Sequence, residues 1–206
     1  MRFIQHLLAV ASLSLFAATA GASPTAPVNG TDYRTLEKAQ QVDSGKKVEV
    51  TEFFWYSCPH CSALEPALEA WVKKQGDKIN FKRVPVAFRD SFIPQQKLYY
   101  SLEALGLVNS LHGKVFRAIH VERQPLDTDK QIADFIAKQG VDAKKFAEVY
   151  NSFGIQSKVQ RATQLQGAYK VDGVPMIAID GRYITSPSIV GASLGNRPEA
   201  ILHDAT

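Results

Sequence analysis

The chain of 206 residues contains only two cysteines, Cys58 and Cys61, which stand three positions apart. A small scaffold held by disulfides needs several cross-links, and a four-thiolate zinc site needs twice as many thiolates as this chain has. Both classes are excluded. Any sulfur chemistry in this protein therefore falls to one close pair.

Long apolar runs are missing as well. The longest, residues 7–18, is shorter than the ~20 residues that cross a bilayer. It follows a short basic start with Arg2 and leads into the small residues 19–22, a pattern typical of a secretory signal peptide. We expect cleavage after Ala22 and export of a mature chain without a membrane anchor.

The sequence has little excess charge of either sign. The formal net charge is +4, from 24 basic and 20 acidic residues, and the basic residues are scattered. Because no long basic stripe exists, nucleic acid is not an expected partner. A hydrophobic content of 45% with 21% charged residues is instead typical of a soluble globular protein.

The first half of the mature chain predicts two strands around one helix. Residues 23–46 read as an exposed entry segment, and the β-branched and aromatic run at 48–54 predicts a buried strand. Pro59 suits the first turn of a helix, which the apolar spacing extends over 59–75. Residues 79–88 are a second strand candidate, whose far half Pro85 marks as an edge or exit.

The second half predicts mainly helices. After the second strand, apolar residues recur at helical spacing in four amphipathic segments, which are separated by Gly106, Pro125, Gly140 and Gly154. A further helix at 157–169 precedes two strands, 176–180 and 182–185, and Asp180-Gly181 between them is a hairpin signal.

This order predicts an α/β sheet domain that is interrupted by an all-helical insertion. The expected limits are a signal peptide at 1–22, a sheet domain formed by 23–88 with 155–206, and an inserted helical domain at 89–154. Trp55 and Trp71 are expected in the core.

The two cysteines are expected to be reactive. Outside the cytosol a close pair is either a structural disulfide or a redox centre. A disulfide that closes so small a loop removes little chain entropy from the unfolded state, so it would stabilise the fold only weakly. Cys58 stands where strand gives way to helix, so first-turn N–H groups, at about 1.5–3 kcal/mol each, should stabilise its thiolate more than the helix dipole does. Pro59 and His60 between the cysteines should tune it further. A stable thiolate makes the disulfide a strong oxidant, with Cys58 exchanging and the deeper Cys61 resolving the mixed disulfide.

Glu52 is a candidate for proton transfer. In a strand alternate residues share a face, so Glu52 lies with the apolar Val50 and Phe54. If that face is the core, the pKa of Glu52 should rise and the carboxyl could pass a proton toward Cys61. If the strand turns over, Glu52 is solvated. Periodicity over so few residues leaves both options open.

The export signal, the strand before the C-P-H-C tetrad at 58–61, and the distant Gly173-Val174-Pro175 give the chain its family resemblance. It resembles the DsbA family of periplasmic thiol:disulfide oxidases in the thioredoxin superfamily. The resemblance implies a thioredoxin fold with an inserted helical domain, and a cis Val174–Pro175 peptide that faces the cysteines. It also implies that the Val174 backbone binds extended substrate.

The implied substrates are reduced, unfolded secreted polypeptides. The implied reoxidant is a quinone-linked membrane oxidase of the DsbB type, and no metal or other cofactor is implied. The chain departs from the family in two places. A buried lysine that often accompanies the strand glutamate is replaced by Lys82 or Arg83 in an open register, and residues 199–203 leave only a stub for the closing helix.

Three other functions remain open at this stage. A disulfide isomerase or reductase of the same compartment would share the fold and cysteines, although His60 favours the oxidase and no dimerisation segment is evident, so a monomer is expected. A metal-binding module would use both thiolates with His60, His112 or His120. A binding protein with a purely structural disulfide conflicts with the small loop.

Overall fold

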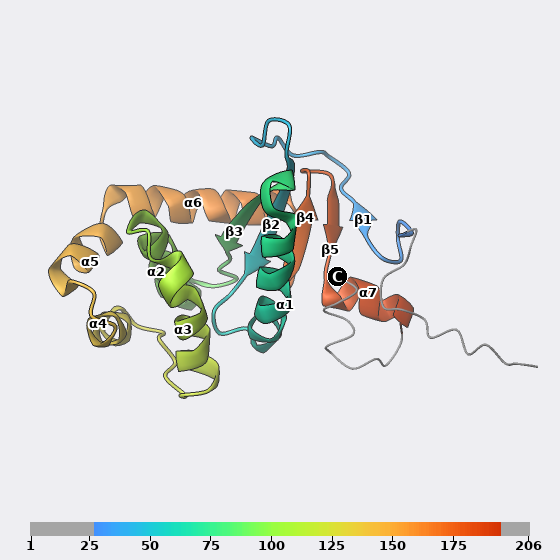
Figure 1. Ribbon diagram of the computed structural model, residues 1–206. Helices are drawn as coiled ribbons and strands as arrows, with labels where there is room; N and C mark the ends of the chain where they lie inside the picture. Colours follow the sequence, from blue (N-terminus) through green and yellow to red (C-terminus); the bar gives the residue numbers. More distant parts are fainter. Residues whose placement is uncertain (1–26, 195–206) are drawn as a thin grey trace, which may run out of the picture.

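The computed structural model describes residues 27–194, so the expected signal peptide and the stub at 199–203 lie outside the described residues (Figure 1). A mixed five-stranded sheet has the order β1-β5-β4-β2-β3. Its strands are β1 Arg34–Thr35, β2 Val48–Phe54, β3 Ile79–Pro85, β4 Met176–Ile179 and β5 Tyr183–Thr185. Only β2 and β3 are parallel, and the other neighbours are antiparallel.

The predicted hairpin is confirmed. Asp180 and Gly181 connect β4 and β5 with φ of 51° and 65°, the left-handed conformation that a tight hairpin turn requires at both central positions. A Cβ on Gly181 would lie 2.2 Å from the Gln40 carbonyl oxygen, so only glycine fits. At the opposite edge, β3 ends at Pro85 and not at residue 88, because its partner strand β2 ends at Phe54. The Val86 N–H still donates to the Phe54 carbonyl oxygen, so the missing N–H of Pro85 lies on the free side of this edge strand.

Seven α-helices complete the described part of the chain, and two short 3-10 turns, η1 Gly76–Lys78 and η2 Asp90–Phe92, join elements. The helices are α1 Pro59–Gln75, α2 Ile93–Ala104, α3 Val108–His120, α4 Asp129–Lys138, α5 Ala143–Tyr150, α6 Phe153–Ala168 and α7 Pro187–Leu194. Helix α1 has the predicted limits, and α2 to α5 are the four predicted amphipathic segments.

The prediction of a break at Gly154 is wrong. Helix α6 begins at Phe153 because the Ser152 side chain accepts a hydrogen bond from the Ile155 N–H, so Gly154 lies inside its first turn. The domain limits at residues 89 and 154 stay predictions. None of the helices within 27–194 combines the length and apolar character needed to span a membrane.

Helix α1 covers one face of the sheet, where Leu64 and Leu68 pack against Val50 and Ile177 (Figure 1). Its Trp71 is 41% exposed, so the prediction of a core position is wrong for that residue. Trp71 lies on the outer side of α1, away from the sheet-facing stripe, whereas Trp55 packs on the core as predicted.

The helical insertion lies beyond the β3 edge of the sheet (Figure 1). Its core is continuous with that of the sheet, through an aromatic cluster around the buried Phe54. The ring of Phe54 lies 5.2 Å from Tyr99 of α2 and 6.1 Å from Phe116 of α3, and Tyr56 lies 5.2 Å from Phe116. The insertion is therefore packed directly beside the segment that joins β2 to α1.

Candidate active site

Cys58 occupies the predicted position at the start of α1. It is the N-cap residue, with extended backbone angles, and its sulfur accepts a hydrogen bond from the Cys61 N–H at 3.4 Å. Pro59 takes the first helical position, where no N–H is needed. Cys58 is 6% exposed and Cys61 is fully buried, so the expectation that Cys61 is the less accessible sulfur is confirmed.

The two thiols differ in acidity. The pKa of Cys58 is lowered from 9.0 to about 7, first by a hydrogen bond from the Cys61 thiol and then by the backbone N–H groups of Cys61 and His60 and the charge of His60. Burial opposes this shift. The comparison of amide contacts with the helix dipole stays a prediction, and the Cys61 thiol, which it left out, contributes more than the amides do. Burial and the neighbouring Cys58 raise the pKa of Cys61 far above its usual range.

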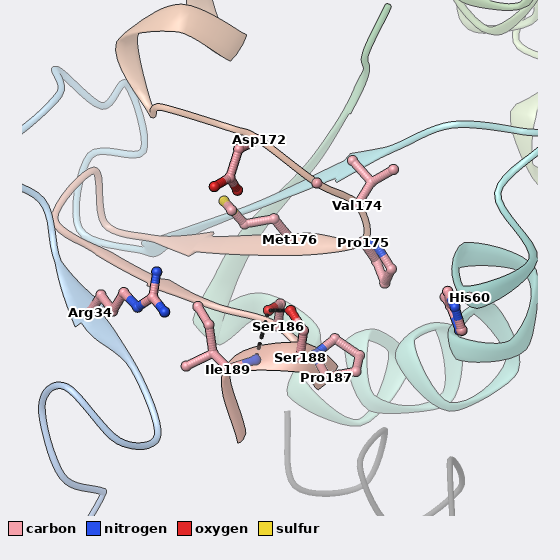
Figure 2. Close-up of a pocket in the computed structure, with 11 residues that line it drawn as sticks. Arg34, His60, Asp172, Val174, Pro175, Met176, Ser186, Pro187, Ser188 and Ile189 are labelled. Atoms are coloured by element: carbon pink, nitrogen blue, oxygen red, sulfur yellow. Dashed lines mark hydrogen bonds between the residues drawn. The ribbon is translucent and has the colours of Figure 1, made fainter. Parts of the chain in front are cut away.

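The distant loop that follows α6 lies against the reactive sulfur. The Val174–Pro175 peptide is cis, as the resemblance implies, and the Cys58 thiol donates a hydrogen bond to the Val174 carbonyl oxygen at 3.3 Å. A pocket of about 570 Å³ opens beside this loop. Figure 2 shows His60 on one side of the pocket, Arg34 of β1 on the other, and Pro175 between them.

Glu52 is buried, which answers the question that periodicity left open. Its side chain is inaccessible to solvent because α1 covers this face of β2. In the parallel pairing of β2 with β3, Glu52 lies opposite Arg83, and Arg83 Nε donates to Glu52 Oε2 at 2.9 Å. Lys82 points the other way and pairs with Glu49 at 2.7 Å. Arg83 therefore fills the place of the expected lysine.

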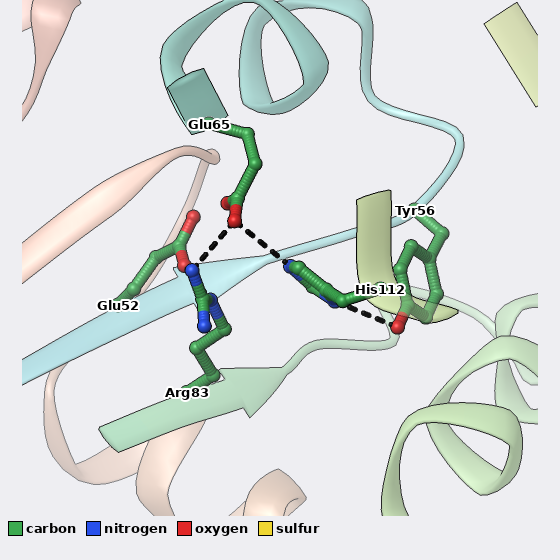
Figure 3. A network of polar contacts seen from close by, with 5 residues as sticks. All are labelled: Glu52, Tyr56, Glu65, Arg83 and His112. Carbon is green, nitrogen blue, oxygen red and sulfur yellow. Dashed lines mark hydrogen bonds and ion pairs between the residues drawn. The ribbon is translucent and has the colours of Figure 1, made fainter. Parts of the chain in front are cut away.

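A second carboxyl that the sequence analysis missed shares Arg83 (Figure 3). Arg83 Nη2 donates to Glu65 Oε1 at 2.6 Å, so one guanidinium bridges Glu52 of the sheet and Glu65 of α1. Glu65 follows Cys61 by one helical turn, and this spacing places it on the same buried face. From this spacing the sequence alone could have predicted that Glu65 lies near Cys61.

The buried carboxyls are unusually basic. Burial raises the pKa of Glu52 to about 7, repulsion from Glu65 adds to the effect, and Arg83 opposes it. Burial likewise raises the pKa of Glu65 to about 7. Glu52 in turn raises the pKa of Cys61, so the two groups interact electrostatically. Glu52 Oε1 has no hydrogen-bond partner among the described residues and can hold a proton.

Two histidines of α3, His112 and His120, both bond Tyr56 and not the cysteines. Burial lowers the pKa of His112 to about 3, and its Nδ1 lies 2.8 Å from the Tyr56 hydroxyl. His120 Nε2 donates to the Tyr56 carbonyl oxygen at 2.8 Å. Among residues 27–194, no three His, Cys, Asp or Glu side chains gather in a way that could hold a metal ion.

Fold and site together define a thiol:disulfide oxidoreductase of the thioredoxin superfamily. The family model described as a DSBA-like thioredoxin domain matches residues 80–205. The thiol:disulfide interchange protein DsbA of Burkholderia cepacia is 49% identical over 185 residues, which cover 89% of this chain and 87% of that protein. The chain therefore belongs to the DsbA family.

Other relatives agree with this assignment. The thiol:disulfide interchange protein DsbA of Pseudomonas aeruginosa is 40% identical over 177 residues, covering 86% of this chain and 82% of that protein. A crystal structure of P. aeruginosa DsbA superposes with a TM-score of 0.75 at 38% identity, over 79% of this chain and 84% of that one. The oxidoreductase DsbA of Xylella fastidiosa also gives 0.75, at 26% identity, over 86% and 92% of the two chains. The expected thioredoxin fold with a helical insertion is confirmed, and the chain is a disulfide oxidase.

Proposed function

We propose that this protein oxidises cysteine pairs in reduced, unfolded polypeptides that have been exported to the periplasm, acting as a monomer. The observation that carries the proposal is the opposite perturbation of the two thiols, with the pKa of Cys58 lowered to about 7 and that of Cys61 raised. A stabilised Cys58 thiolate favours the reduced form of the protein. Its disulfide is then held weakly and is donated to substrates.

In the first step a substrate thiolate attacks Cys58 Sγ. A substrate–Cys58 disulfide forms, the Cys58–Cys61 bond breaks, and Cys61 leaves as a thiolate. Because the raised pKa makes Cys61 a poor leaving group, it needs a proton. The protonated carboxyl of Glu52, whose pKa is about 7, supplies that proton.

In the second step another substrate thiolate attacks the substrate sulfur of the mixed disulfide. The substrate disulfide forms and Cys58 leaves as its stabilised thiolate, so two electrons have passed from substrate to this protein. The substrate chain lies extended along Val174 and Pro175, with its backbone paired to Val174. A quinone-linked membrane oxidase of the DsbB type accepts the two electrons and restores the disulfide.

The direct test mixes the oxidised protein with a reduced peptide that carries two cysteines. The peptide should gain a disulfide, and Cys58→Ala should be inert. Cys61→Ala has no disulfide to donate, so it is mixed instead with the disulfide form of the peptide, where its Cys58 thiolate should attack and be held as the mixed disulfide. Equilibration with glutathione then gives the reduction potential. A value near that of thioredoxin, about −270 mV, would overturn the oxidising direction in favour of a reductase.

Glu52 and export have separate tests. Glu52→Gln should change the pH dependence of the exchange rate, and an unchanged profile would remove Glu52 from the mechanism. Cell fractionation with amino-terminal sequencing should recover a periplasmic chain that begins near Ser23, and a full-length chain retained in the cytosol would contradict export.

A further inference from the structure

The nucleophile is preceded by a tight turn of four residues. Trp55, Tyr56, Ser57 and Cys58 form this turn, which is closed by a hydrogen bond from the Cys58 N–H to the Trp55 carbonyl oxygen at 3.0 Å. Since Cys58 is also the N-cap of α1, the turn decides how its sulfur meets the first-turn N–H groups. The contacts of the turn therefore bear on the chemistry.

Each of the first three turn residues is held by the helical insertion. The Trp55 ring stacks on Phe92 of η2, with centroids 3.7 Å apart and an angle of 13° between the planes. His120, the last residue of α3, donates to the Tyr56 carbonyl oxygen. Because a turn has no strand partner, its backbone carbonyl groups depend on side chains such as His120 for their hydrogen bonds.

Gln95 of α2 holds Ser57 at two atoms. Its Oε1 accepts from the Ser57 N–H at 3.2 Å, and its Nε2 donates to Ser57 Oγ at 2.7 Å. The same amide nitrogen contacts the Pro125 carbonyl oxygen at 3.1 Å and Asp127 Oδ1 at 3.3 Å, in the loop that follows α3. Gln95 is 2% exposed, so water does not replace these bonds.

We propose that Gln95 and His120 are positioning residues for the exchange reaction, through which the inserted helices hold the turn that presents Cys58. The inference rests on the proposed role of Cys58 as the exchanging thiol. The distances leave little slack, because Cys58 Sγ is already 3.4 Å from the Cys61 N–H and 3.3 Å from the Val174 oxygen. A turn freed from its anchors would displace the sulfur from both partners.

The chain offers a matched control in the next residue. Gln96 is also on α2, is 1% exposed, and also donates across to the sheet domain, to the Pro85 carbonyl oxygen at 2.8 Å. Among the described residues, its side chain makes no hydrogen bond to the turn. Gln95→Leu and Gln96→Leu each remove a buried amide that bonds α2 to the sheet domain, and only the first frees Ser57.

The experiment measures thiolate absorbance against pH and the equilibrium constant with glutathione, for wild type and each variant. We expect Gln95→Leu and His120→Leu to raise the pKa of Cys58 by about one unit and to shift the equilibrium about tenfold toward the disulfide form. Gln96→Leu should lose stability and leave both values unchanged. His120→Gln keeps an N–H donor, so its two values should lie closer to those of wild type than the values of His120→Leu do.

Equal values in Gln95→Leu, His120→Leu and Gln96→Leu would overturn the inference and leave the insertion a purely structural role. If Gln95→Leu does not fold, His120→Leu and His120→Gln decide between the same outcomes. Failure of the proposed function is distinguishable, because wild type itself would then show no exchange with the reduced peptide.

Discussion

Replacing Glu52 by glutamine should change how stability depends on pH. The carboxyl is fully buried, and its pKa rises from 4.5 to about 7 in the folded protein. Below pH 4.5 both states hold the proton. Between 4.5 and 7 the unfolded chain ionises first, so the free energy of unfolding falls as pH rises, by about 3 kcal/mol for this one group.

The glutamine of Glu52→Gln cannot ionise, so this variant should lack that decrease in the free energy of unfolding. It keeps a polar partner for Arg83, which still pairs with Glu65, so the variant should be more stable than wild type above neutral pH. The expected gain approaches the same ~3 kcal/mol at about pH 8. Any fall that remains between about pH 4.5 and 7 belongs to Glu65, whose pKa is also raised to about 7.

The assay is urea unfolding followed by tryptophan fluorescence, from about pH 4 to about pH 9. It uses the disulfide form, so that no thiol titrates. Glu148→Gln, an exposed change on α5, is the control and should follow the wild-type curve. If Glu52→Gln loses as much stability over this range as wild type, the buried carboxyl does not carry the proton and the reasoning from burial fails.

Three further outcomes are expected. Since the pKa of Cys58 falls from 9.0 to about 7, its ionisation stabilises the reduced fold as pH rises through 7 toward 9, and urea unfolding should show the reduced form gaining about 3 kcal/mol over the disulfide form; a constant difference would contradict this. Arg83→Met strands Glu52 and Glu65 and should cost about 3–5 kcal/mol above neutral pH and less in acid, so an equal loss at both pH values would refute the shared ion pair. Gly181→Ala should lower the melting temperature without changing exchange activity, because its Cβ meets backbone at 2.2 Å, and wild-type stability would contradict the turn geometry.

The elements that local signals define were predictable from the sequence. Pro59 and Gly76 delimit α1, and Asp180-Gly181 gives the hairpin, since these residues act on their own backbone. Strand β1 has only two residues, and α7 contains no charged side chain that would mark an exposed face, so neither was predicted. Gly154 was wrongly predicted to break the helix, because the Ser152 cap outweighs a glycine in the first turn of α6.

The parts of the site that are formed by short sequence motifs were predictable. The parts that depend on how the strands and helices pack were not. The cysteines, their order of burial and the loop at Val174 follow from the motif and the resemblance. The burial of Glu52 did not, because both faces of β2 are covered and alternation then carries no information. The choice between Lys82 and Arg83 depends on strand register, which tertiary contacts fix and a slip of one residue would reverse.

The order of these parts along the chain has a consequence for synthesis. The cysteines leave the ribosome before Gln95 and His120, and Val174 comes last of all. Until those later segments have docked, Cys58 belongs to an unfinished turn and has neither its lowered pKa nor a substrate surface beside it. A half-made molecule is therefore a poor oxidant, and the protein becomes reactive toward its neighbours only when nearly the whole chain has been made.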